Sequence, residues 1–265
     1  MKTSRIFGFD ILNVKKTELF EYFDNFLINN KPAKTQVVFT PNPEQIVLAK
    51  HNQFFANHLK KADWLLPDGI GLVWASCILE FFGKTEEEIT ERIAGVELVE
   101  HLLETIAKYP DYNTLIIGGR DYVGSFEGEF FEDIKSLKKI KNNLYWTQGY
   151  QEKTEILPIE EEALEKIISR LKPKIVFVAL GAPDQEKWII EHLDLLNKNQ
   201  AKIAVAVGGS FDFLFAKVTR APQLWQKIGL EWLWRLIKQP WRRKRQLRLL
   251  NFLVLLSREV FTSTV

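Results

Sequence analysis

The chain has 265 residues, 46% of them apolar, and a formal net charge of +2, which is enough apolar material for a large buried core. No run approaches the roughly 18 to 20 apolar residues of a membrane-spanning helix, so an integral membrane protein is excluded. The single cysteine, Cys77, cannot form an internal disulfide, and residues 1–14 lack the apolar run of a signal peptide. We therefore expect a globular protein of the reducing cytoplasm.

Apolar, β-branched runs that end in glycine or a turn recur along the chain, and helical patterns follow them. These predicted strands lie at 35–40, 114–120, 174–183 and 202–209. A helix is expected over 41–50, directly after the first run, and a long amphipathic helix over 85–109. Continuous apolar strands between amphipathic helices indicate a parallel sheet with helices on both faces, which is the α/β class.

The composition changes at residues 219–226 (TRAPQLWQ). Beyond them tryptophan mixes with arginine and leucine, Pro240 is expected to separate two helices, and from Arg235 to Arg248 there are seven basic residues and no acidic one. Such a segment is typical of a helix at a bilayer interface; a core-packing helix pair with a basic edge is the alternative. Nucleic-acid binding is disfavoured because no recognised motif accompanies the basic residues. We predict an α/β domain at 1–219 and a helical appendage at 220–265.

Several familiar catalytic and nucleotide-binding motifs are missing. The chain has no P-loop, no glycine-rich dinucleotide fingerprint after a strand, and no G-x-S-x-G nucleophile elbow. Its histidines are scattered without metal-ligand spacing and are interpreted as surface or packing residues: His51, His58, His101 and His192.

Polar residues gather where the predicted strands end, and in open parallel sheets ligands bind at that edge. The strand-end segments are 40–45, 118–120, 181–186 and 208–212. The short polar groups expected at the edge are Thr40, Asn42, Asp68, Gln185, Glu186 and Asp212. This set suits recognition of a polyhydroxylated or nucleotide ligand better than covalent catalysis.

Several candidate residues also have a structural interpretation. Asp68 lies in a Pro-Asp-Gly turn tripeptide. Thr40 or Asn42 could cap the helix that begins near Pro43. Arg92 could pair with Glu88 one helical turn earlier.

Five segments together resemble, in order and spacing, the WecG/TagA/CpsF bacterial glycosyltransferases (glycosyltransferase family 26). The segments are FTPNPEQIVLA, ADWLLPDGIGLVWA, ERIAGVELV, VALGAPDQEKWI and VGGSFDFLFAKVTRAPQLWQKIGLEWLWRLIKQPWRRKRQ. The resemblance spans nearly the whole chain. It implies a Rossmann-like α/β domain with a C-terminal appendage that engages the cytoplasmic face of the cell membrane. It also implies transfer of N-acetylmannosamine or a related N-acetylhexosamine, with inversion, from a UDP-sugar to an undecaprenyl-diphosphate-linked sugar in teichoic acid or surface polysaccharide synthesis.

The resemblance also assigns residues. Asp68 matches the family's proposed catalytic base and Thr40 a nearby active-site hydroxyl, while Gln185 and Asp212 match donor-pocket residues. Appendage arginines are expected to close over the diphosphate. The full expected substrate-binding set is Asn42, Arg92, Gly118, Gly181, Gln185, Glu186, Gly208, Gly209, Asp212, Arg220, Arg235, Arg242 and Arg245.

The chemistry of an inverting transfer agrees with these assignments. One carboxylate must accept the acceptor hydroxyl's proton, and the departing diphosphate needs positive charge. The chain has no Asp-x-Asp, so arginines would supply that charge and no metal or other cofactor is expected. Departures from the family pattern at Asp184, Phe215, Ala216 and Cys77 leave the donor sugar and the acceptor open.

Two alternative functions remain open. A nucleotide-dependent oxidoreductase is disfavoured by the missing fingerprint, and a non-catalytic membrane-associated binding module would leave the retained motifs unexplained. Separately from these functions, the sequence is compatible with a homo-oligomer, because a partner subunit could cover the apolar, tryptophan-rich tail.

Overall fold

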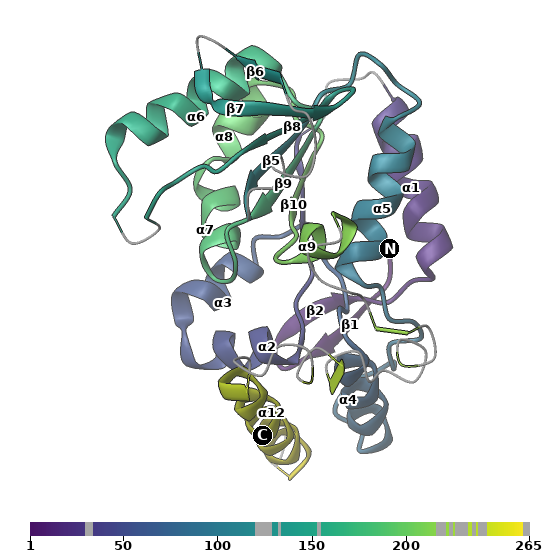
Figure 1. Cartoon of the computed structure of the whole chain (residues 1–265). Coiled ribbons are helices and arrows are strands. Elements are labelled where there is room, and N and C mark those ends of the chain that lie inside the picture. The colour runs from purple at the N-terminus through teal and green to yellow at the C-terminus, as the bar shows by residue number, and fades with distance from the viewer. Residues whose placement is uncertain are drawn as a thin grey trace.

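The computed structural model describes residues 1–29, 34–119, 129–131, 134–152, 155–215, 221–222, 225, 233–234, 237 and 243–261. Its centre is an eight-stranded sheet with helices on both faces, and a two-stranded sheet lies beside it (Figure 1). The α/β class expected from the sequence is confirmed.

The large sheet is mixed. Its strands, in chain order, are β3 (Gln36–Phe39), β4 (Trp64–Leu65), β5 (Thr114–Gly118), β6 (Glu129–Phe131), β7 (Ile134–Lys141), β8 (Leu144–Thr147), β9 (Ile175–Ala179) and β10 (Ile203–Ala206). The spatial order is β4-β3-β10-β9-β5-β8-β7-β6. From β4 to β8 every neighbouring pair is parallel, so the four predicted strands are confirmed as parallel.

The antiparallel edge formed by β7 and β6 was not expected from the sequence. A two-residue turn at Asn142 and Asn143 joins β7 to β8. Asn142 has φ +47 there, a left-handed conformation that asparagine tolerates and that tight hairpins require. The local turn chemistry therefore reverses the chain direction at this edge of an otherwise parallel sheet.

Each face of the sheet has its own apolar cluster. Val176 and Val178 of β9 point into one, and Ile175 and Phe177 into the other, as the period of two in a strand requires. The helices that contribute to the first cluster include α2 (Pro43–His51), α3 (Gln53–Leu59), α6 (Pro158–Leu171), α7 (Asp184–Glu191) and α8 (Leu193–Lys198). Those of the second are α1 (Lys16–Ile28), α5 (Gly95–Ile106) and α9 (Ser210–Leu214).

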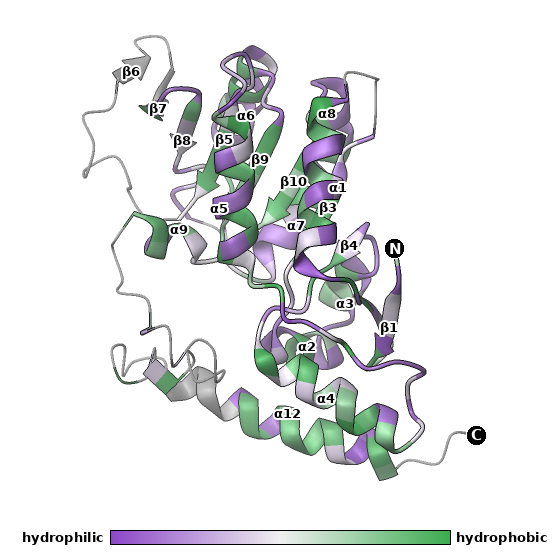
Figure 2. Cartoon of the chain, turned by 90° about the vertical axis from the view of Figure 1, so that its right-hand side faces the viewer, coloured by the Kyte–Doolittle hydropathy of each residue, from purple (hydrophilic) through white to green (hydrophobic). Residues whose placement is uncertain are grey.

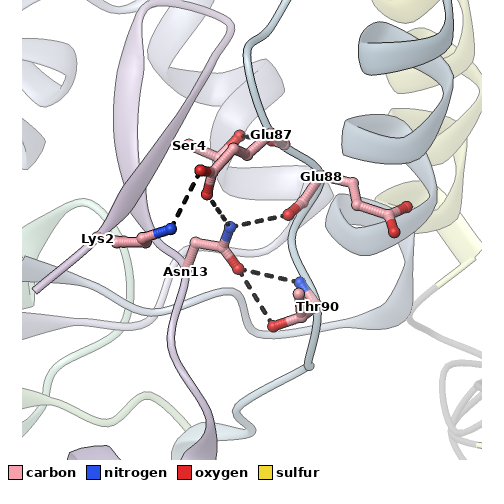
Figure 3. Close-up of polar contacts among 6 residues, drawn as sticks. All are labelled: Lys2, Ser4, Asn13, Glu87, Glu88 and Thr90. Atoms are coloured by element: carbon pink, nitrogen blue, oxygen red, sulfur yellow. Dashed lines mark hydrogen bonds and ion pairs between the residues drawn. The ribbon is translucent and has the colours of Figure 1, made fainter.

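The predicted helix over 85–109 is wrong in its first part, because only Gly95–Ile106 is helical. The preceding residues are held away from helical geometry by the hairpin of β1 (Thr3–Ile6) and β2 (Phe9–Leu12) and the residues that follow it. The Asn13 side chain donates to Glu88 O (2.8 Å) and accepts from Thr90 N (3.0 Å), as Figure 3 shows.

Two further contacts in Figure 3 fix the same segment. Ser4 Oγ donates to Glu87 O (2.5 Å), and Lys2 Nζ lies 3.2 Å from Glu87 Oε1. The bonds to Glu87 O and Glu88 O occupy carbonyl groups that a helix would use itself. The contacts join residues more than seventy positions apart, so local sequence pattern could not reveal them.

The end of the molecule away from the large sheet contains α4 (Ile70–Phe81) and α12 (Arg243–Phe261), which lie side by side (Figures 1 and 2). Phe252, Leu256 and Val260 of α12 are buried and join the first apolar cluster. The Phe252 ring also meets Phe7 edge-on, with ring centroids 5.3 Å apart. The inner face of α12 therefore packs on the core. Pro240 lies outside the described residues, and the boundary at 219/220 stays a prediction.

Candidate active site

The carboxyl ends of β4, β3, β10, β9 and β5 meet at one edge of the sheet, because these five neighbours are parallel. The four strand-end segments expected from the sequence, and the turn containing Asp68, all follow these strands. Of the predicted segments only Arg120 lies outside the described residues. The predicted gathering of polar groups at this edge is thus present.

Asp68 lies in a tight turn between β4 and α4. Its backbone N–H donates to Leu66 O (2.9 Å) and to Pro41 O (3.1 Å), so the turn is fastened to the residues that follow β3. Gly69 has φ +103, a backbone conformation that residues other than glycine rarely adopt. Asp68 is partly exposed at the edge. The turn interpretation of Pro-Asp-Gly is therefore confirmed, and the site role of Asp68 stays a prediction.

The start of α4 packs directly against the start of α2. A Cβ atom on Gly71 would lie 2.8 Å from Pro43 Cγ, so only glycine allows this approach. Asn42 caps α2: its side chain accepts from Gln45 N (3.1 Å), and Gln45 Oε1 accepts from Asn42 N (3.1 Å), which is a capping box. The capping interpretation is confirmed for Asn42. Thr40 instead donates through Oγ1 to Ala206 O (3.4 Å) and faces β10.

Arg92 lies beside the same turn. The N–H of its neighbour Ile93 donates to Pro67 O (3.1 Å). The Arg92 guanidinium lies 3.7 Å from Glu97 Oε1, with 17% of its side chain exposed. The helical spacing suggested for Arg92 and Glu88 is absent, because residues 85–94 are not helical.

Gln185 and Glu186, at the start of α7, are buried, with 3% and 1% exposed. Gln185 Oε1 accepts from the backbone N–H groups of Gly181 (3.2 Å) and Gly208 (3.0 Å). Its Nε2 donates to Glu186 Oε1 (2.9 Å), and so does Gln45 Nε2 (3.2 Å). Burial, with a smaller contribution from the nearby Asp184 carboxylate, raises the pKa of Glu186 to about 7.

The remaining glycines and Asp212 complete the edge. A Cβ on Gly118 would lie 2.7 Å from Leu180 Cδ2, so this glycine permits close packing between β5 and the residues after β9. A Cβ on Gly209 would lie 3.3 Å from Asp212 Oδ2, which places the Asp212 carboxylate over the turn that follows β10. Asp212 itself is partly exposed.

The expected appendage arginines cannot be placed against this edge. Arg220, Arg235 and Arg242 lie outside the described residues, and for Arg245 the description covers the backbone of α12 alone. Within the described ranges, no three or more His, Cys, Asp or Glu side chains are grouped so that they could hold a metal ion. Metal independence stays a prediction.

Sequence reasoning missed two features near the edge. Gln45 is the first, although its position three residues after Asn42 is the spacing of a capping box. The second is a buried cluster after β8: Trp188 Nε1 donates to the Tyr150 hydroxyl (2.7 Å), which donates to Glu161 Oε2 (2.5 Å). Burial, with Glu161 adjacent, raises the pKa of Tyr150. His192 stacks on Trp188 and bonds Glu161, so its interpretation as a packing residue is confirmed.

Comparison with known proteins identifies the class of the molecule. Residues 4–264 match the glycosyl transferase family WecG/TagA/CpsF. The chain belongs to this family, so the enzyme class expected from the sequence, a sugar transferase, is confirmed.

Two relatives illustrate the likeness, and both are named N-acetylglucosaminyldiphosphoundecaprenol N-acetyl-beta-D-mannosaminyltransferase. The protein of Bacillus subtilis (strain 168) is 30% identical over 259 residues, which cover 98% of this chain and 93% of the relative. The protein of Staphylococcus aureus (strain MRSA252) is 26% identical over 243 residues, covering 92% and 87%.

Proposed function

We propose that this enzyme transfers N-acetylmannosamine, with inversion, from a UDP-sugar to N-acetylglucosamine linked to undecaprenyl diphosphate, in teichoic acid or related surface polymer synthesis. The observation that carries the proposal is the placement of Asp68, a partly exposed carboxylate on a fixed turn at the parallel-strand edge. The names of the two relatives suggest the transferred sugar, N-acetylmannosamine, and the acceptor, N-acetylglucosaminyldiphosphoundecaprenol. The UDP carrier follows from the family resemblance.

Asp68 is the general base of this reaction. The acceptor hydroxyl oxygen attacks the anomeric carbon from the face opposite to the UDP group. The bond between that carbon and the diphosphate oxygen breaks, and the electron pair leaves with UDP. The hydroxyl proton passes to the Asp68 carboxylate, which contributes about 10² to 10⁴ in rate for a well-placed base. Thr40, which follows the neighbouring strand, orients the reacting sugar.

Positive charge for the diphosphate comes from the protein. The helices α2, α4 and α7 begin directly after β3, β4 and β9, so their N-terminal N–H groups and the positive ends of their dipoles lie at this edge. Arg92 stands beside the Asp68 turn, and the appendage arginines would add further charge. This arrangement needs no metal ion to stabilise the leaving group.

The outer faces of α4 and α12 form the membrane-contacting surface. Exposed apolar side chains lie on both helices, and Figure 2 colours much of α4 and α12 as hydrophobic. They are Trp74, Ile78, Phe81, Leu250, Leu253, Val254 and Phe261, with Phe82 immediately after α4. Within the described ranges no helix has the length and apolar character to cross a bilayer. A peripheral position on the inner membrane face would bring the strand-end edge to its lipid-linked acceptor.

Product analysis tests the proposed reaction. The purified enzyme is incubated with a panel of UDP-N-acetylhexosamines and a lipid-diphosphate-linked N-acetylglucosamine acceptor, and products are identified by mass spectrometry. We expect one added N-acetylhexosamine, with UDP-N-acetylmannosamine as the preferred donor. Transfer from a different donor would change the sugar assignment, and no transfer from any UDP-sugar would refute the reaction.

A thermal shift experiment separates this function from the oxidoreductase alternative. A ligand that binds only the folded state raises the melting temperature. Stabilisation by UDP and not by NAD is expected, and the opposite pattern would favour the oxidoreductase.

A further inference from the structure

We propose that Glu186 is a positioning residue that holds three strand-end turns in register and does not itself touch the substrate. The inference rests on the proposed transferase function for its kinetic test, and on geometry alone for its structural test. It revises the substrate-binding assignment that the sequence suggested for this residue.

Glu186 joins the turns that follow β3 and β9. Its Oε1 accepts one hydrogen bond from Gln45 Nε2 (3.2 Å) and one from Gln185 Nε2 (2.9 Å). Gln45 belongs to α2 and closes the capping box with Asn42, so this bond fixes the turn that follows Thr40. A single carboxylate oxygen therefore links the beginnings of α2 and α7.

Gln185 extends the link to the turn that follows β10. While its amide N–H donates to Glu186, its Oε1 accepts from Gly181 N (3.2 Å) and Gly208 N (3.0 Å). Gly208 stands directly before the Gly209 and Asp212 turn. The orientation of this amide decides whether both backbone N–H groups are satisfied, and Glu186 sets that orientation because it accepts from the opposite end.

Burial argues against direct substrate contact. Glu186 is 1% exposed, whereas Asp68 and Thr40 at the same edge are partly exposed. An ionisable group in such a place is unfavourable unless it is hydrogen-bonded. The second oxygen, Oε2, is buried without a hydrogen-bond partner in the part of the chain that the structure describes. Both side-chain hydrogen bonds to Glu186 from described residues reach Oε1, the oxygen that faces the two glutamines.

This geometry gives a matched pair of variants. Glu186→Gln retains an accepting oxygen for the two amides and changes the atom that has no partner. Glu186→Ala removes the acceptor and leaves two buried N–H groups unsatisfied. Glu191→Ala is the control on the same helix, because Glu191 is exposed and its carboxylate lies 4.0 Å from the exposed Lys187 ammonium.

Hydrogen exchange measured by mass spectrometry tests the link without any substrate. We expect peptides covering 180–185 and 206–212 to exchange at least about tenfold faster in Glu186→Ala, and at near wild-type rates in Glu186→Gln and Glu191→Ala. Unchanged exchange at 206–212 in Glu186→Ala would overturn the proposal. Should that variant fail to fold, Gln45→Ala serves instead, since faster exchange at Gly208, distant in sequence, cannot come from loss of the α2 cap alone.

Kinetics with the product assay tests the consequence. Glu186→Ala should lose about 10- to 100-fold in kcat, the effect of a displacement near 1 Å at a reacting group, while KM for the donor changes little. Glu186→Gln should stay within about threefold of the wild type. The pH profile of kcat should keep the same acidic limb in Glu186→Gln, because either protonation state offers an oxygen to both amides. If Glu186→Gln were inactive, or if its pH profile of kcat lost the acidic limb, Glu186 would take part in a charge-dependent step. Either result would overturn the positioning role.

The two proposals fail in different ways. If the wild type transfers no sugar while the exchange pattern is as expected, the reaction is wrong and the positioning link stands. If the wild type transfers sugar and Glu186→Ala matches it in kcat and exchange, the link is wrong and the reaction stands.

Discussion

The strand-end edge and the α4–α12 end of the molecule are built on opposite principles. At the edge, side chains are tied to the backbone of neighbouring turns: Gln185 to Gly181 and Gly208, and Asn42 to Gln45. At the other end, large apolar side chains stand exposed on two helices. Hydrogen bonds fix position to a fraction of an ångström, as chemistry requires. Apolar area has no direction, which suits adhesion to a fluid surface.

The two regions meet where α12 packs on the starts of α2 and α4. Phe252 is buried against this junction, and a Cβ on Gly71 would lie 4.0 Å from its ring. Gly71 follows the Asp68 turn by three residues, and Pro43 follows the Asn42 cap. A helix that belongs to the proposed membrane-contacting surface therefore also supports the elements that carry the candidate base.

The largest expected effect is the loss of turnover when Asp68, at the strand-end edge, is replaced. Asp68→Asn should lower kcat by about 10² to 10⁴ because the proton acceptor is lost, while UDP affinity stays nearly unchanged because the donor contacts remain. Steady-state kinetics and calorimetric titration with UDP measure the two quantities. Asp194→Asn, an exposed carboxylate on α8, is the control. Unaltered turnover in Asp68→Asn would refute the base assignment.

The junction is tested by Phe252→Ala. Removing this buried ring should destabilise the protein by about 3 to 5 kcal/mol, measured by urea denaturation. Phe261→Ala on the same helix is the control, because that ring is 80% exposed and its loss should change stability by less than about 0.5 kcal/mol. Equal stability of the two variants would mean that α12 contributes nothing to the core.

The parts of the fold that the sequence predicted are those determined locally. Continuous apolar runs identify the central strands in the sequence, since both faces of a central parallel strand are buried. These strands are 36–39, 114–118, 175–179 and 203–206. The same reasoning predicted the wrong structure for residues 85–94, which are not helical. Their acidic, periodic sequence fits a helix, but side chains from the β1–β2 hairpin hold them through long-range hydrogen bonds.

Prediction of the candidate site from the sequence was also limited by contacts between residues far apart in the chain. The glycine-rich strand ends locate Asp68, Gln185 and Asp212 at one edge, and topology follows from the βαβ pattern. The sequence does not reveal that Gln185 and Glu186 turn inward and bond one another. Two adjacent polar residues at a helix start could equally face a ligand. The inward orientation of Glu186 depends on a partner far away in the sequence, Gln45 of α2.

The exposed end is tested by a double variant that leaves the edge intact. Trp74→Ser with Phe81→Ser should weaken binding to anionic liposomes by about 30- to 800-fold, because each lost aromatic ring removes about 1 to 2 kcal/mol of interfacial burial and every 1.4 kcal/mol is about tenfold in affinity. Flotation assays measure binding. Phe54→Ser is the matched control: Phe54 is 83% exposed but lies on α3, outside this surface. A double variant that binds liposomes as well as the control would move the membrane contact elsewhere.

The smallest expected effect separates a structural cap from a cap that also supports chemistry. Asn42→Ala should destabilise the protein by about 1 kcal/mol through loss of the α2 cap, measured by urea denaturation. Asn52 is a natural control, because it caps α3 by accepting from Phe55 N (3.0 Å), and Asn52→Ala should cost a similar amount. Only Asn42 belongs to the chain of contacts that runs through Gln45 to Glu186. Turnover should therefore fall in Asn42→Ala and stay unchanged in Asn52→Ala, and equal turnover in the two variants would reduce Asn42 to an ordinary cap.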